Sequence, residues 1–281
     1  MPHIERMRPL MGTFVTIRAD SVPSLTAEQM ETAVQSAFRA VECVDRHMSF
    51  HRKRNDIGRL NRGRPGMILR VHRWTYTVLG EAIRLWQVSG GVFDCDVGAH
   101  LIRAGLLPGS ILGRSRRHLK LGAAITLRPD HKVLLHRSVS LDLGGIAKGF
   151  AVDKAVETLK AHGVKSGLVN AGGDLRVFGM NPQPIWVRRP DSNEQRQLIG
   201  TLNSGAVATS AAYFTRDAST DNIEASAVFD TTRNRRVVTK RSISVIARTC
   251  MQADALTKIA MIRGRLPTSL ARPAQAQVIQ L

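Results

Sequence analysis

DLGGIAKGFAVD, at residues 142–153, predicts a strand that turns through glycines into a helix. Glycine lets the backbone approach a ligand closely, and the first turn of the helix presents unpaired N–H groups to an anion. The spacing matches neither GxGxxG nor GxxxxGK(S/T), which excludes a Rossmann fingerprint and a Walker loop. A tight strand–helix connection without a ligand is the alternative. The helix is expected to end at His162-Gly163, with an apolar face formed by Val152, Ala155, Val156 and Leu159.

Apolar periodicity predicts further elements on both sides of this turn. A long helix follows Thr26, because Thr26 and Gln29 have capping-box spacing and apolar residues recur on one face up to Met48. Further helices are expected at residues 72–86 and 252–262. Strands are expected at residues 11–19, 132–135, 138–141 and 242–247, with a hairpin at 167–178. This order of helices and strands predicts one α+β body. Residues 266–281 carry no clear signal, and we expect them to pack loosely.

The composition describes an ordinary globular chain of 281 residues, with 43% hydrophobic and 22% charged residues. The formal charge of +19 would attract nucleic acid, anionic lipid or a phosphate-bearing ligand. Aromatic residues are few, and the basic stretches at 52–54, 114–117 and 233–236 are scattered, so we expect no nucleic acid partner. Three widely spaced cysteines, no signal peptide and no transmembrane segment favour a cytoplasmic protein.

Three other segments supply polar groups of the kind that bind phosphates and metal ions. Asn170-Ala-Gly-Gly-Asp174 is a second glycine turn, for which a plain hairpin turn is the alternative. Ala208-Thr209-Ser210 and Ala253-Asp254-Ala-Leu-Thr257 offer hydroxyl and carboxylate oxygens, which Mg²⁺ prefers. Asp254 could equally be a charge that stabilises a helix N-terminus.

Taken together, seven segments in this order resemble the ApbE family, the FAD:protein FMN transferases. They are residues 11–13 (MGT), 49–61 (SFHRKRNDIGRLN), 91–98 (GVFDCDVG), 142–153, 170–174 (NAGGD), 206–210 (AVATS) and 253–256 (ADAL). The resemblance runs over residues 8–264, which we expect to form one FAD-binding transferase domain, followed by a C-terminal tail at 265–281.

The resemblance implies a single-body α+β fold that binds FAD in a cleft, with Mg²⁺ on the pyrophosphate. It also implies transfer of FMN to a threonine of an acceptor protein, with release of AMP. By position in the family motifs, Met11, His51, Phe93, Asp94, Asp142 and Lys148 would line the FAD site. The Gly145 carbonyl, Asp254 and Thr257 would hold the metal.

Two departures from the family pattern concern the chemistry. Lys258 stands where the family often has a metal-binding threonine, so either Lys258 replaces part of the metal's charge or Thr257 reaches the ion from a shifted helix turn. Ala227 replaces the histidine proposed as the catalytic base, whose help is typically worth about 10²- to 10⁴-fold in rate.

Asp230 is then expected to be catalytic if burial raises its pKa, with Asp96 as the other carboxylate and a turn-capping role for Asp230 as the alternative. A homologue that binds FAD without transferring FMN remains a second hypothesis. A nucleic-acid-binding protein is a third, resting only on the charge.

Overall fold

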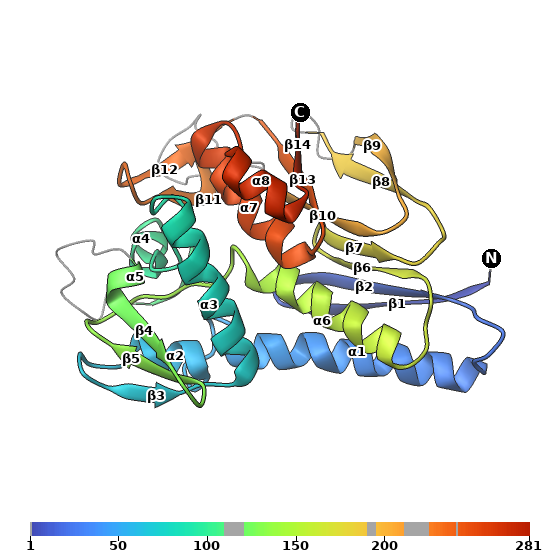
Figure 1. The fold of residues 1–281 in the computed structure, drawn as a ribbon, viewed down its shortest axis with the longest axis horizontal. Coiled ribbons are helices and arrows are strands. Elements are labelled where there is room, and N and C mark those ends of the chain that lie inside the picture. Colours follow the sequence, from blue (N-terminus) through green and yellow to red (C-terminus); the bar gives the residue numbers. More distant parts are fainter. Residues whose placement is uncertain (1, 110–120, 190–194, 211–224, 240) are drawn as a thin grey trace.

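The computed structural model describes residues 2–109, 121–189, 195–210, 225–239 and 241–281, and not the side chains of 225–227. Its largest sheet is antiparallel and has seven strands. In spatial order they are β1 (His3–Leu10), β2 (Thr13–Asp20), β6 (Gly167–Ala171), β7 (Asp174–Phe178), β10 (Gly205–Ser210), β13 (Ile243–Ala247) and β14 (Gln277–Gln280). Strands from both ends of the chain therefore share one sheet (Figure 1).

Three helices cover one face of this sheet: α1 (Ala27–Met48), α6 (Ala147–Ala161) and α7 (Cys250–Arg263). The predicted capping box of α1 is present, because the Thr26 hydroxyl accepts from the Gln29 N–H and the Gln29 side chain accepts from the Thr26 N–H. The predicted apolar stripe of α1 is buried in full and packs on the sheet and on α6. Amphipathic periodicity thus located this helix and its inner face correctly.

Residues between α1 and α6 form a second region beside the main sheet, at the lower left of Figure 1. It contains α2 (Asp56–Asn61), α3 (Arg73–Val88), α4 (Gly98–Arg103), α5 (Leu121–Ala124), β3 (Ile68–Arg70), β4 (Ile125–Arg128) and β5 (Lys132–Leu135). The hairpin of β8 (Gln183–Arg188) and β9 (Arg196–Leu202) adds Ile185 to a small apolar cluster with Val177 of β7. The hairpin of β11 (Ala225–Asp230) and β12 (Arg235–Val238) lies near α7. One hydrophobic core joins the two regions, which confirms a single α+β body.

The predicted strand at residues 138–141 is wrong. Strand β5 pairs instead with β4, through a turn at Asp130 and His131, whose φ angles of 59° and 56° suit a tight hairpin. The Ser140 and Leu141 N–H groups donate to the carboxylate of Asp96 and to the side-chain carbonyl of Asn61. Side chains from distant segments therefore accept the backbone hydrogen bonds of residues that the apolar pattern predicted to pair as a β-strand.

The C-terminal stretch is also more ordered than expected. Residues Thr268–Ala274 form helix α8, which buries Leu270 and Ala274, and β14 pairs with β13 along four residues. Neither element shows a strong periodic pattern of apolar residues in the sequence. Helix α8 is too short for one, and β14 forms because it pairs with β13. Loose packing of this stretch was therefore a wrong expectation.

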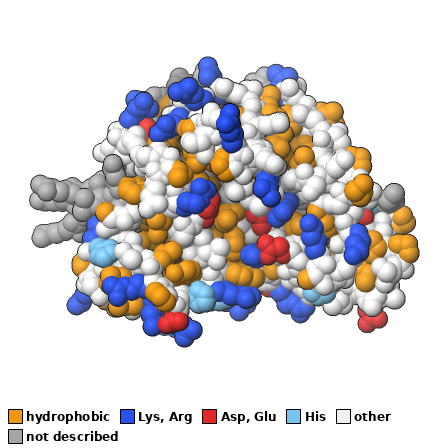
Figure 2. Space-filling view, in the orientation of Figure 1, with side chains coloured by type: hydrophobic (Ala, Val, Ile, Leu, Met, Phe, Trp, Pro, Cys, Tyr) orange, Lys and Arg blue, Asp and Glu red, His pale blue; other side chains and the backbone are white. Residues whose placement is uncertain are grey.

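Positive charge is spread over the surface. On the face shown in Figure 2, Lys and Arg side chains stand among hydrophobic and acidic ones and do not gather in one patch. Residues 52–54 and 233–234 lie exposed in loops and turns, Arg235 and Arg236 begin β12, and the basic stretch at 114–117 lies outside the described residues. Within the described ranges, no helix combines the length and the apolar character that crossing a bilayer requires.

Helices α6 and α7 meet backbone to backbone at Gly149. A Cβ atom built at Gly149 would lie 2.2 Å from the carbonyl oxygen of Cys250. Asp153, one turn further along α6, accepts hydrogen bonds from the Cys250 and Met251 N–H groups, both at 2.9 Å, and from Arg176 at 2.7 Å. This contact fixes the start of α7 against α6.

Gly149→Ala should destabilise the protein by about 3 kcal/mol, because the helices must separate to admit the methyl group. Gly80→Ala is the matched control, since a Cβ at Gly80 of α3 meets only Leu127 at 3.5 Å. Removing a helical glycine there should stabilise the protein by about 1 kcal/mol. Urea denaturation measures both values, and equal effects of the two substitutions would contradict the close contact.

Candidate functional site

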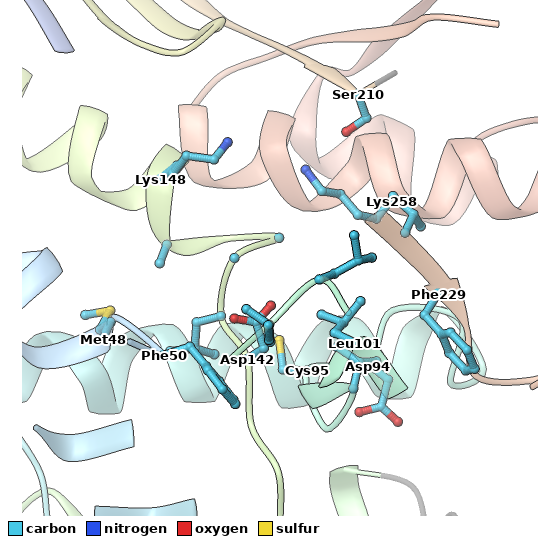
Figure 3. A pocket seen from close by; sticks show the side chains of 18 of the residues that line it. Met48, Phe50, Asp94, Cys95, Leu101, Asp142, Lys148, Ser210, Phe229 and Lys258 are labelled. Carbon is cyan, nitrogen blue, oxygen red and sulfur yellow. The ribbon is translucent and has the colours of Figure 1, made fainter. Parts of the chain in front are cut away.

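A cavity of about 470 Å³ opens between the glycine turn before α6, helix α7 and the second region. Figure 3 shows side chains of its lining. The residues expected to bind FAD all line it, as does Gly145: they are Met11, His51, Phe93, Asp94, Asp142 and Lys148. Met11 and Gly12 form the two-residue turn between β1 and β2, with φ angles of 55° and 72°. Sequence reasoning thus brought together residues that lie up to 137 positions apart, from Met11 to Lys148.

The glycine turn differs from the expected ring of unpaired N–H groups. The N–H groups of Ile146 and Ala147 donate to the carbonyl of Leu143 at 3.0 and 2.8 Å, and that of Gly149 donates to Asp254 Oδ2 at 3.1 Å. The chain's own acceptors therefore occupy these donors. Positive charge at this side of the cavity comes chiefly from lysine side chains.

Two lysine–carboxylate pairs stand beside the turn. Lys148 Nζ pairs with Asp174 Oδ2, and Lys258 Nζ pairs with Asp254 Oδ1. Both carboxylates are buried, whereas both lysines line the cavity. In Figure 3 the two lysine side chains reach toward the same space above the turn. Asp174 closes the predicted Asn170–Asp174 turn, where Gly172 and Gly173 have positive φ angles.

The charged groups of this cluster shift one another's pKa values. Burial alone would lower the pKa of Lys148, but the neighbouring carboxylates Asp174 and Asp254 outweigh it and raise that pKa, so Lys148 is an ammonium. Burial and repulsion by Asp254 raise the pKa of Asp174 above its ordinary value. Burial also opposes ionisation of Asp254, yet attraction by Lys258 and then Lys148 lowers the pKa of Asp254.

The expected metal residues Asp254 and Thr257 lie behind the cavity wall and do not line it. Both side chains are fully buried. The Thr257 hydroxyl donates to the Asp254 backbone carbonyl at 2.7 Å and shares a hydrogen bond of 2.8 Å with Ser210 Oγ. Ser210, the last residue of β10, reaches the cavity.

Two cavity carboxyls have raised pKa values. Burial raises the pKa of Asp142, against a hydrogen bond from the Gly144 N–H and the attraction of His51. Burial also raises the pKa of Asp94 to about 7, although the Asp96 N–H donates to its Oδ1 at 2.8 Å. Asp94 can therefore exchange a proton near neutral pH.

Asp230 and Asp96 are held in structural contacts. The Asp230 Oδ1 accepts from the Thr232 N–H at 2.9 Å, the Thr232 hydroxyl at 2.6 Å and the Arg233 N–H at 3.1 Å. Asp96 pairs with Arg137 at 2.6 Å and accepts from Ser140. Neither lines the cavity, although Phe229, next to Asp230, does. The turn-capping alternative describes the observed contacts of Asp230, and its catalytic role stays a prediction.

Sequence reasoning missed the apolar wall of the cavity. Leu101 of α4 lines it with Leu106 and Leu107, and Val228 and Phe229 of β11 join them. The ring of Phe229 stacks on His100 at 4.1 Å between centroids. The helical spacing of apolar residues at 97–101 was a usable signal, whereas the approach of β11 depends on tertiary packing.

The fold and site define a class: an α+β protein whose cleft combines an apolar wall with two ammonium groups, as a cofactor with a planar ring and phosphates requires. Residues 11–278 match the ApbE family, and the chain belongs to it. It is 29% identical to the FAD:protein FMN transferase of Vibrio cholerae, covering 91% of this chain and 80% of that protein. It is 26% identical to the FAD:protein FMN transferase of Treponema pallidum, covering 92% of this chain and 78% of that protein.

Solved structures have the same fold. The flavin transferase ApbE from Vibrio cholerae superposes with a TM-score of 0.81 at 25% identity, covering 99% of this chain and 93% of that one. The ApbE protein from Thermotoga maritima gives 0.82 at 24% identity, with 99% and 94% covered. The expected family and α+β architecture are confirmed.

The raised pKa of Asp94 makes stability depend on pH. Since the folded pKa of about 7 exceeds the ordinary 3.8, its contribution is fully present below pH 3.8 and is lost as pH rises through about 7. The difference corresponds to at most about 4 kcal/mol. Asp94→Asn should therefore flatten the fall in unfolding free energy between pH 5 and 8, measured by urea denaturation.

Asp130→Asn is the matched control, since Asp130 is an exposed turn carboxylate and asparagine tolerates its positive φ. It should leave the pH dependence unchanged. A wild-type slope that survives Asp94→Asn would refute a buried carboxyl titrating near neutral pH.

Proposed function

We propose that this protein transfers FMN from FAD to a threonine of an acceptor protein and releases AMP. The observation that carries the proposal is the cavity beside the glycine turn, where Lys148 and Lys258 face an apolar wall containing Phe229. Membership of the ApbE family and the names of its relatives support the reaction.

The cavity fits the two unlike parts of FAD. Its apolar side chains suit a flavin ring, and its ammonium groups suit a dianionic pyrophosphate. We assign Met11, His51, Phe93, Asp94, Asp142 and Lys148 to binding of FAD. In this assignment Lys148 of α6 and Lys258 of α7 hold the phosphates.

In the proposed reaction the threonine oxygen attacks the phosphorus of the FMN half. The bond from that phosphorus to the bridging oxygen breaks, AMP leaves with that oxygen, and the threonine proton passes to solvent. Negative charge accumulates on the leaving phosphate, so positioning and cationic groups dominate catalysis. Lys148 and Lys258 are placed to offset that charge.

Mg²⁺ on the pyrophosphate, held by the Gly145 carbonyl, Asp254 and Thr257, remains the expectation of the family resemblance. Asp254 and Thr257 lie behind the cavity wall in the contacts described above. No step of the proposed mechanism passes through a metal ion.

A homologue that binds FAD without transferring FMN is the second candidate. Two observations favour it: the family histidine position is Ala227, and the Asp230 carboxylate is engaged by its own turn. This candidate keeps the same cavity and the same ligand. It differs in forming no AMP.

Incubation with FAD and an acceptor domain that carries the family's threonine motif should release AMP and add the mass of FMN to the acceptor. Chromatography measures AMP, and mass spectrometry measures the acceptor. An acceptor with that threonine changed to alanine is the control. FAD that binds but stays intact with every acceptor and divalent cation tried would replace this proposal with the FAD-binding candidate.

Lys148→Gln should weaken FAD binding about 10- to 100-fold, because a charge-assisted contact worth about 1.5–3 kcal/mol is lost. Quenching of flavin fluorescence gives the dissociation constant. Lys154→Gln is the matched control, since Lys154 lies on the same helix and pairs with Glu157 away from the cavity lining. Equal affinity of the two variants would remove Lys148 from the FAD site, provided thermal melting shows both folded.

A further inference from the structure

The buried carboxylate expected to bind a metal already holds a cation. Asp254 Oδ1 pairs with the ammonium of Lys258, one helical turn further along α7. Its other oxygen, Oδ2, accepts a hydrogen bond from the Gly149 N–H at 3.1 Å. Asp254 is 0% exposed, so neither oxygen is open to an ion from solvent.

Of the other two expected ligands, Thr257 is buried and engaged, whereas Gly145 lines the cavity. Thr257 Oγ1 is bonded to the Asp254 carbonyl and to Ser210, and it is also 0% exposed. Gly145 lines the cavity beside the stem of Lys258: a Cβ there would lie 3.5 Å from Lys258 Cε, an ordinary van der Waals contact. Mg²⁺ demands near-octahedral oxygen ligands. To be held by both Asp254 and Thr257, it would have to displace the Lys258 ammonium from Asp254 Oδ1 and disturb the two hydrogen bonds of the Thr257 hydroxyl, so these residues do not fit it.

The charges lead to the same conclusion. Without Lys258, the carboxylates of Asp174 and Asp254 would share the single ammonium of Lys148 and leave one excess negative charge. A dianionic phosphate group could not approach that cluster without an added cation. With Lys258 each buried carboxylate has its own ammonium, and the cluster is neutral before any ligand binds.

Lys258 is also placed to contact a ligand. Its side chain is 18% exposed and lines the cavity beside Ser210 and the glycine turn. In Figure 3 it reaches toward Lys148 over that turn. An ammonium has three N–H donors, so the bond to Asp254 leaves donors for phosphate oxygens.

We propose that Lys258 takes the place of a divalent cation at Asp254, so that the protein binds the pyrophosphate of FAD through Lys258 and Lys148 without a metal ion. This inference rests on the proposed function only in taking FAD as the ligand. It replaces the metal expected from the family resemblance with a residue of this chain.

The test measures metal and FAD binding rather than FMN transfer. Titration of the wild-type protein with Mn²⁺, followed by electron paramagnetic resonance with and without FAD, should show no uptake at the cavity. Excess EDTA should change the FAD dissociation constant by less than about twofold, well below the 5- to 150-fold expected of two coupled ligands. Lys258→Thr should take up one Mn²⁺ in the presence of FAD and should make FAD affinity depend on metal about tenfold or more.

Lys154→Thr is the matched control, because it makes the same substitution at a position of α6 outside the cavity lining; it should behave as the wild type does. Stoichiometric Mn²⁺ uptake by the wild-type protein, or loss of FAD affinity in EDTA, would overturn the inference. So would a folded Lys258→Thr variant that takes up no Mn²⁺. The wild-type measurements decide the question even if that variant does not fold.

These outcomes are separate from those of the transfer assay. If the protein binds FAD in EDTA but forms no AMP, the proposed role of Lys258 stands and the proposed transferase activity is contradicted. If the protein transfers FMN and takes up Mn²⁺ at this site, the transferase activity stands and the proposed role of Lys258 is contradicted.

Discussion

The contact between the backbones of α6 and α7 at Gly149 is the constraint on which the site depends. It is closed by hydrogen bonds that cross from one helix to the other: Asp153 of α6 accepts from the first N–H groups of α7, and Asp254 of α7 accepts from Gly149 of α6. The two carboxylates thus act reciprocally. Because Lys148 and Lys258 lie next to these partners, the same contact that joins the helices sets the separation of the two ammonium groups.

Burying so many charges is tolerable only because each has a partner. An uncompensated buried charge typically costs about 3–5 kcal/mol, so removing one member of such a cluster threatens the fold as well as the ligand site. In this protein the carboxylates lie inside and the lysines at the cavity wall. A phosphate therefore meets cations that are already oriented by their buried partners, and less conformational entropy is lost when it binds.

Local signals in the sequence located the long helices α1, α3, α6 and α7, the strands β2, β6, β7 and β13 of the main sheet, and the polar side of the cavity. The turn at 144–145 does lead into a helix, but the described residues show no strand before it, and its Ile146, Ala147 and Gly149 N–H groups are occupied. The capping box and apolar stripe of α1 and the hairpin turn at 172–173 are short-range features, and each was interpreted correctly. Residues 138–141 were not, because Asp96 and Asn61, far away in sequence, satisfy their backbone. Asp254 and Lys258 lie one turn apart on α7, so their pairing is local, whereas the burial of Asp254 and Thr257 requires tertiary structure; sequence spacing alone left both lysine and threonine as candidates beside Asp254.

The main sheet places residues far apart in the chain next to each other. Strand β2 pairs with β6 in the register Thr16 to Asn170, and all of residues 21–166, including the second region and α6, lie between those two strands. Closing so long a loop costs conformational entropy before the strand pairing contributes any stabilising free energy. Such non-local pairing slows folding. The N-terminal hairpin must therefore wait, during synthesis, for β6 to emerge before it gains its inner neighbour. Until then its β2 edge is open to other strands, and the cavity, which includes the Met11 turn of that hairpin, is incomplete.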